Sequence, residues 1–189
     1  MENLETQNNE NNFGDNPFIT QPAVSLGKNA LTYGLILGGI STVYNLILWV
    51  FGQTLNKPLG YLGLIFTLGV MFYGTKVYRD KYLGGFMSYG KAYTSNFLIG
   101  LYASIIGTIY TFILFKYIDP TLLNTIKDTA IEAAMQKNPN ISQEDLEKSM
   151  GFFMTPLFMT FSTLFAGVFG SAIIALIVSF FHKKEAPII

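Results

Sequence analysis

The chain has 189 residues, of which 50% are hydrophobic and only 13% charged, with 12 basic and 12 acidic side chains. Soluble domains carry about 25% charged residues, so this composition favours a protein in contact with lipid, of a length that fits one domain. The balanced charge gives no basic surface for nucleic acid, which we do not expect as a partner. The chain has no cysteine, which excludes disulfides, thiolate metal sites and cysteine nucleophiles.

Residues 1–27 are polar and acidic, rich in asparagine, and contain two prolines. A segment with so few apolar side chains cannot form a core, so we expect a disordered tail. It lacks the basic start and the apolar run of a cleaved signal peptide. The first hydrophobic segment is therefore expected to act as an uncleaved signal anchor. Residues 185–189 are expected to form a short C-terminal tail.

Four segments without charged residues follow the tail, and each is about long enough to cross a bilayer. A helix needs about 20 apolar residues to span the ~30 Å hydrocarbon core. None of the segments has the polar stripe that a helix of a soluble bundle carries. We therefore predict an all-α fold, an integral membrane four-helix bundle over residues 28–184, with spans at about 29–51, 58–75, 92–115 and 156–181.

The connection between the third and fourth spans, about 119–155, is long enough for structure of its own. The pair Asp119-Pro120 is typical of a helix start. Asn138-Pro139-Asn140 indicates a break, and Ser142 with Asp145 three residues later resembles a capping box for a second helix. We predict an extramembrane amphipathic helical hairpin that rests on the outer interface or on the ends of the bundle.

Basic residues in short loops indicate which side of the membrane faces the cytoplasm. With four spans, both termini and the loop between the second and third spans lie on the same side. That side carries Lys28, Lys76, Arg79, Lys81, Lys91, Lys183 and Lys184. Most lysines of the other side lie within the long connection, where charge counts for less. We predict a multi-pass protein of the bacterial inner membrane with both termini in the cytoplasm.

Small residues recur four apart in the first, third and fourth spans. Helices in lipid associate through close packing over such residues. We expect packing within one chain, with a homodimer face as the alternative, and a more peripheral second span because it lacks such a stripe. The residues expected at helix contacts are Gly34, Gly38, Gly100, Ser104, Gly107, Gly167 and Ser171.

No Asp, Glu, Lys or Arg lies at membrane depth, where proton relays and ion-coupled carriers place such residues. The amides of Asn45 and Asn96 are expected to make hydrogen bonds between helices, or else to line a substrate path. His182, the only histidine, is expected to anchor the last span at the interface. We expect no catalytic residue, no metal and no cofactor.

The basic loop carries the residues that are candidates for contact with a partner protein or with lipid. Its glycines lack the strand, the helix and the terminal Lys-Ser/Thr of a phosphate-binding loop, so we expect a tight turn with Ser88 capping the third span. Ordinary anchoring at the inner leaflet is the alternative to partner binding. The candidate residues are Arg79, Asp80, Lys81, Gly84, Gly85 and Tyr89.

Two motifs in the chain resemble those of a known family. They are Tyr78-Arg79-Asp80-Lys81-x-Leu83-Gly84-Gly85-x-x-Ser88-Tyr89-Gly90-x-Ala92 and Phe115-Lys116-Tyr117-Ile118-Asp119-Pro120. The chain is similar, from about Lys28 to Lys184, to the bacterial membrane family catalogued as domain of unknown function forty-one ninety-nine. This resemblance implies a four-helix inner-membrane protein of Gram-negative bacteria and assigns no activity.

Together these features predict a non-enzymatic integral membrane protein that serves as an accessory or interaction component of an envelope complex. Its partners are then the lipid bilayer and a membrane or cytosolic protein. The alternative is a small homo-oligomeric channel or carrier, with a path along Asn45, Asn96 and the stripes of small residues.

Overall fold

A computed structural model describes residues 24–184 of the chain. The predicted tail over residues 1–27 lies mostly outside the described residues, as does the predicted C-terminal tail over residues 185–189. The helices are α1 (Leu26–Val50), α2 (Lys57–Val77), α3 (Tyr89–Ile113), α4 (Leu122–Lys137), α5 (Gln143–Phe153) and α6 (Pro156–Phe180), with single π-helical turns η1 (Tyr78–Tyr82) and η2 (Leu114–Ile118).

The prediction of an all-helical chain with four long apolar helices is confirmed. Within residues 24–184, four helices are long and apolar enough to cross a membrane, namely Leu26–Val50, Lys57–Tyr82, Tyr89–Ile118 and Pro156–Phe180. The second and third are longer than predicted, because η1 and η2 continue α2 and α3 past the basic residues that ended the charge-free segments. The predicted tail boundary also needs correction, since Leu26 and Gly27 already belong to α1.

Each of the four long helices begins directly after a polar residue whose side chain accepts a hydrogen bond from a backbone N–H of the first turn. Such caps satisfy donors that have no partner within the helix. Pro58 and Pro156 lie in the first turns of α2 and α6, where the missing N–H of proline leaves no helical hydrogen bond unmade. The capping residues are Ser25, Asn56, Ser88 and Thr155.

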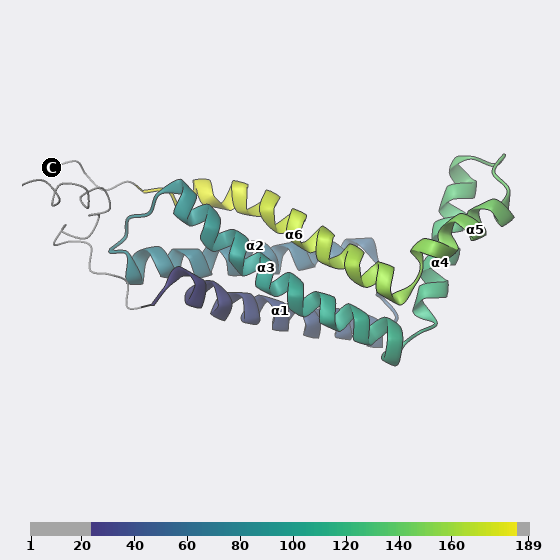
Figure 1. Cartoon of the computed structure of the whole chain (residues 1–189), viewed down its shortest axis with the longest axis horizontal. Helices are drawn as coiled ribbons and strands as arrows, with labels where there is room; N and C mark the ends of the chain where they lie inside the picture. The colour runs from purple at the N-terminus through teal and green to yellow at the C-terminus, as the bar shows by residue number, and fades with distance from the viewer. Residues whose placement is uncertain (1–23, 185–189) are drawn as a thin grey trace, which may run out of the picture.

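The four long helices lie side by side, and α4 and α5 lie beyond one end of them (Figure 1). The helix α3 packs most extensively, against α1 and α6, whereas α2 makes fewer contacts with its neighbours. This agrees with the peripheral position expected for the second span. We call the end where α1 and α3 begin and α2 and α6 finish the closed end, and the end beside α4 and α5 the far end.

Burial is concentrated near the two ends of the bundle. At the closed end, one cluster of buried apolar residues comprises Ala30, Leu37, Met71, Ile99 and Ala175. At the far end, Leu114 and Phe115 pack against Leu122 and Leu123 of α4. Between these clusters, no described residue of α6 from 156 to 170 or of α2 from 57 to 70 is fully buried. The tightest packing among the four long helices is therefore at the closed end.

The starts of α4 and α5 differ in detail from the sequence prediction. Asp119 does satisfy the first turn of α4, because its Oδ1 accepts from the backbone N–H groups of Thr121 and Leu122, both at 3.1 Å. Ser142 precedes α5 as predicted, but its hydroxyl makes no capping hydrogen bond. The predicted capping hydrogen bond of Ser142 is therefore not formed, although α5 begins directly after Ser142 as the motif predicted.

Candidate functional site

The loop between α2 and α3 is a tight turn at the closed end. Gly84 and Gly85 have φ values of 64° and 89°, a backbone region that only glycine adopts without strain. The N–H of Gly85 donates to the carbonyl oxygen of Arg79 at 2.9 Å, which closes the turn onto η1. The two predicted glycines thus reverse the chain, and no phosphate-binding geometry is formed between a strand and a helix.

The charged candidates stand on η1, directly before this turn. The Nε of Arg79 lies 2.7 Å from Oδ1 of Asp80, and the side chains are 17% and 43% exposed. The ammonium of Lys81 lies 5.5 Å from the ring centre of Tyr82. Arg79 and Asp80 therefore form a paired, partly exposed charge cluster.

The turn is joined to the end of α6 by three hydrogen bonds. Met87 and Lys184 form an antiparallel bridge, with N–H to O distances of 2.8 and 2.9 Å. The hydroxyl of Tyr89 donates to the carbonyl oxygen of Leu176 at 3.1 Å, and its ring lies 4.9 Å from that of Phe180. Tyr89 thus links the start of α3 to α6.

A chain of buried side-chain hydrogen bonds runs beneath this turn. The hydroxyl of Thr75 donates to Oδ1 of Asn96 at 2.9 Å, and Nδ2 of Asn96 donates to the hydroxyl of Ser179 at 3.1 Å. Because Thr75 has given its proton to Asn96, the hydroxyl of Ser95, 2.9 Å away, must donate to Thr75. Ser179 donates in turn to the carbonyl oxygen of Ala175. The network joins α2, α3 and α6.

The first helix is held to the same point by a separate bond. Nδ2 of Asn29 on α1 donates to the carbonyl oxygen of Gly74 on α2 at 3.1 Å. Hydrogen bonds between side chains and neighbouring helices thus connect all four long helices at the closed end. Buried polar groups need such partners, because leaving them unsatisfied costs free energy.

The two asparagines within the predicted spans have opposite environments. Asn96 is fully buried, whereas Asn45 is exposed and donates only to the carbonyl oxygen of Ser41 on its own helix. Gly34 lies against Tyr102, and Gly38 against Ile106. This register places Asn45 level with the end of α3, about 25 Å along that helix from Asn96. The two amides therefore lie far apart, Asn96 inside the bundle and Asn45 on its surface.

His182 corrects the sequence interpretation most clearly. It was expected to anchor α6 at the interface, yet its side chain is 0% exposed. Its Nδ1 lies 3.0 Å from the carbonyl oxygen of Val178, and its Nε2 lies 2.9 Å from that of Phe72 on α2. Burial lowers the pKa of His182 below its ordinary value, and hydrogen bonds to the carbonyls of Val178 and Phe72 oppose this effect. Interface anchoring is excluded by this burial.

The stripes of small residues meet within the chain. A Cβ added to Gly34 would lie 2.5 Å from Cβ of Tyr102, and one added to Gly38 would lie 2.5 Å from Cδ1 of Ile106. These contacts bring α1 and α3 close together. They belong to the helix packing expected of such stripes.

The contact between α3 and α6 is reciprocal. Gly100 of α3 receives the side chain of Ser171, and Gly167 of α6 receives the side chain of Ser104. The expectation for Gly107 is wrong, because a Cβ added there would meet no atom within 4 Å. Gly107 belongs to the same run of small residues but faces away from the tight contact.

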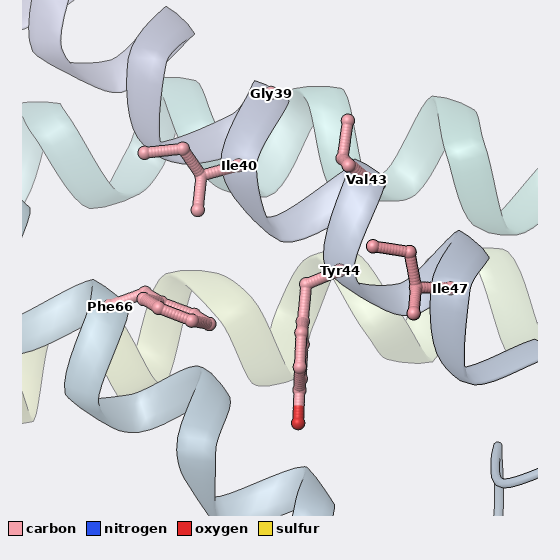
Figure 2. A pocket seen from close by; sticks show the side chains of 6 residues that line it. All are labelled: Gly39, Ile40, Val43, Tyr44, Ile47 and Phe66. Carbon is pink, nitrogen blue, oxygen red and sulfur yellow. The ribbon is translucent and has the colours of Figure 1, made fainter.

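An open groove between α1 and α2 is lined by apolar side chains (Figure 2). Its volume is about 450 Å³, and its lining residues are Gly39, Ile40, Val43, Tyr44, Ile47 and Phe66. The hydroxyl of Tyr44 donates to the carbonyl oxygen of Leu59 at 2.7 Å. The groove therefore offers apolar contact but no free polar group to orient a reacting molecule.

Within residues 24–184, no group of three or more His, Cys, Asp or Glu side chains is placed to hold a metal ion.

Sequence reasoning missed the part that Thr75 plays in the buried hydrogen-bond network, because it placed this residue at the end of a span. The sequence carries no signal for its burial, since a threonine at a span end is compatible with either lipid or protein contact.

The chain matches the sequence model of a known protein family. The sequence model described as "Protein of unknown function (DUF4199)" matches residues 32–184. No curated protein and no solved structure matches the chain. The matched range includes the charged loop, the buried network and His182.

Proposed function

Since this chain belongs to the DUF4199 family of proteins of unknown function, we propose its role from the geometry of the closed end. It is a non-enzymatic multi-pass protein of the bacterial inner membrane, with both termini in the cytoplasm. It acts as an accessory or interaction component of an envelope complex, and its charged turn contacts the partner. The observation that supports this role is that the turn is fixed by hydrogen bonds to α6, while Arg79 and Asp80 directly before it are partly exposed.

The distribution of basic residues supports the orientation. The closed end carries Lys28 in the first turn of α1, Lys76 at the end of α2, Arg79 and Lys81 on η1, and Lys91 in the first turn of α3. Lysine and arginine in short loops near span ends are retained on the cytoplasmic side. The closed end is then cytoplasmic, and the far end faces the periplasm.

With this orientation, α4 and α5 form the extramembrane hairpin. Both lie beyond the four long helices (Figure 1), and α5 has no buried residue. At the junction of α5 and α6 the rings of Phe152, Phe153 and Phe158 pack together, with Phe153 and Phe158 5.0 Å apart. Aromatic residues are enriched at membrane interfaces, which supports a position for this junction at the outer interface.

The proposed interaction role depends on which polar groups are already hydrogen-bonded within the bundle and which are exposed. The buried hydroxyls and amides at the closed end are bonded to one another and join helices. The groove between α1 and α2 is apolar. The charged groups of Arg79 and Asp80, in contrast, are partly exposed on η1, directly before the fixed turn, and suit recognition of a polar partner surface.

The test is a double substitution, Arg79→Ala with Asp80→Ala, which keeps Lys76 and Lys81 and therefore the basic anchors. Co-purification of the partner from native membranes should fall at least about tenfold, with unchanged topology. A matched control is Glu144→Ala with Lys148→Ala, which removes an exposed ion pair, also at 2.7 Å, from α5. Unchanged co-purification by the loop variant, or equal loss in the control, contradicts the proposal.

One observation favours the second candidate, a homo-oligomeric channel or carrier. The amide of Asn45 is exposed on α1, and polar groups exposed to lipid are costly, so a second copy of the chain would shield it. Because the chain has no cysteine, Asn45→Cys supplies a single crosslinking site. Efficient disulfide-linked dimers in native membranes favour the oligomer, and a monomer that retains its partner favours the accessory role.

A further inference from the structure

His182 fastens the end of α6 to α2 at the closed end. Its ring lies 4.6 Å from that of Phe72, and its Nε2 lies 2.9 Å from the carbonyl oxygen of the same residue. On the other side of the ring, Nδ1 lies 3.0 Å from the carbonyl oxygen of Val178, one turn earlier in α6. The side chain is 0% exposed, although it follows the last residue of α6 by only two positions.

A neutral imidazole cannot donate a hydrogen bond to both carbonyl oxygens. A carbonyl oxygen only accepts hydrogen bonds, and a neutral imidazole has one N–H and one lone pair on its ring nitrogens. The neutral ring therefore bonds one carbonyl and turns a lone pair toward the other. Only the imidazolium cation can donate to Val178 and Phe72 at the same time.

Burial of the ring disfavours the imidazolium cation. A charged group loses its hydration when it is enclosed, and a paired carboxylate usually offsets this loss. Neither of the two ion pairs among the described residues involves His182. On η1, Arg79 disfavours and Asp80 favours the cation, and these two groups are paired with each other. In the part of the chain that the structure describes, the other charged groups on η1, at the end of α2 or next to His182 in the chain are Lys81, Lys76, Lys183 and Lys184.

We propose that His182 is a proton-sensitive latch that holds the end of α6 against α2 while the imidazole is neutral and releases it when the ring takes up a proton. Release moves the ring into water, where the cation is hydrated. The bridge between Met87 and Lys184 opens with it, because Lys184 follows the latch by two residues. The latch therefore controls how firmly the turn between α2 and α3 is attached to α6.

The position of the latch makes a local opening feasible. The backbone N–H groups of Phe181 and His182 bond to the carbonyls of Val178 and Ser179 at 3.2 and 3.1 Å, as the final turn of the helix. Helix ends open at lower free energy than the body of a bundle. Enclosure of the ring without a paired carboxylate gives the direction: the cation gains hydration only in the open form, so acidification below about 6.5, where a hydrated imidazole titrates, favours opening. The pKa of His182, which burial lowers, agrees with this direction.

The test uses the single histidine and the absence of cysteine. Full-length protein with ¹⁵N-labelled histidine, freed of any histidine tag, is titrated by NMR in detergent micelles from about pH 8 to pH 4. Spin labels on Tyr73→Cys and Phe181→Cys, which are 60% and 70% exposed in the wild type, report the distance between α2 and the end of α6. This experiment does not depend on membrane orientation or on a partner, so it is independent of the proposed function.

The expected result is a neutral imidazole at pH 8 with one proton on a ring nitrogen. As the pH falls below about 6.5, the ring should be protonated together with a widening of the labelled distance by about one helical turn, ~5 Å. In His182→Gln the distance should be independent of pH. The proposal is overturned if the wild-type distance is constant while the ring titrates, or if His182→Gln widens as the wild type does. If His182→Gln does not fold, the wild-type titration decides alone.

Discussion

The side-chain amide of Asn96 on α3 donates a 3.1 Å hydrogen bond to the hydroxyl of Ser179 on α6, and both side chains are fully buried. The amide oxygen of the same residue accepts from Thr75 on α2. One residue thus uses its donor and its acceptor to join three helices. Because apolar burial contributes little to association between helices in lipid, such bonds and close packing decide how the closed end is assembled.

We predict that Asn96→Leu destabilises the bundle by about 1–3 kcal/mol, because the variant leaves Thr75 and Ser179 without their bonds to the amide. Reversible unfolding in mixed micelles measures the change. Asn45→Leu is the matched control, since Asn45 is exposed and bonds only to its own helix, and its effect should stay within about 0.5 kcal/mol. Equal destabilisation by the two variants would contradict the structural role of Asn96.

A second prediction compares two glycines of α3. In Gly100→Ala the added methyl group would overlap the side chain of Ser171, so we expect a loss of about 1–3 kcal/mol from overpacking. Gly107→Ala meets no neighbouring atom within 4 Å, and the higher helix propensity of alanine should make it neutral or stabilising by up to ~1 kcal/mol. The free energy of unfolding distinguishes them, and a larger loss for Gly107→Ala would refute the packing at Gly100.

The third prediction concerns the far end. The indole Nε1–H of Trp49 donates to Oδ2 of Asp119 at 3.0 Å. Hydrogen bonds from the hydroxyl of Thr121 and from Trp49 lower the pKa of Asp119. A carboxylate with a lowered pKa stabilises the folded state above its unfolded pKa of about 3.9. That stabilisation is lost as the pH falls through the folded pKa.

Trp49 is the only tryptophan, so its fluorescence reports this bond directly. The emission should be constant between about pH 7 and pH 5 and should change in the acid range below about 3.9. Asp119→Asn should abolish that transition, whereas Asp128→Asn, at an exposed position of α4, should leave it in place. Persistence of the transition in Asp119→Asn would show that another group causes it.

The sequence predicted the four long helices well because the physical cause of a span is local. Charged residues are excluded from about 20 consecutive positions, and that pattern is visible without knowing what any helix packs against. Helix starts were partly visible for the same reason. Ser88 was expected to cap the third span, and its side chain accepts from the N–H of Lys91 at 3.4 Å.

The environments of single side chains could not be predicted in this way. Asn45 and Asn96 are alike in sequence context, and only the packing of α2 and α6 around α3 buries one and leaves the other exposed. His182 lies next to two lysines and suggested an interface anchor, but the end of α2 covers it. A stripe of small residues likewise does not reveal which member faces the neighbouring helix, as Gly107 demonstrates.

The central claim is that four helices cross the inner membrane with the closed end in the cytoplasm. It is tested most directly by fusing the chain to a reporter that is active only in the periplasm, inserted after Asn140 in the connection between α4 and α5, and in a second fusion after Gly85. The account predicts high activity for the first fusion and none for the second. A reporter that fluoresces only in the cytoplasm should fluoresce when it is fused to the C-terminus. Activity after Gly85, or none after Asn140, would contradict it.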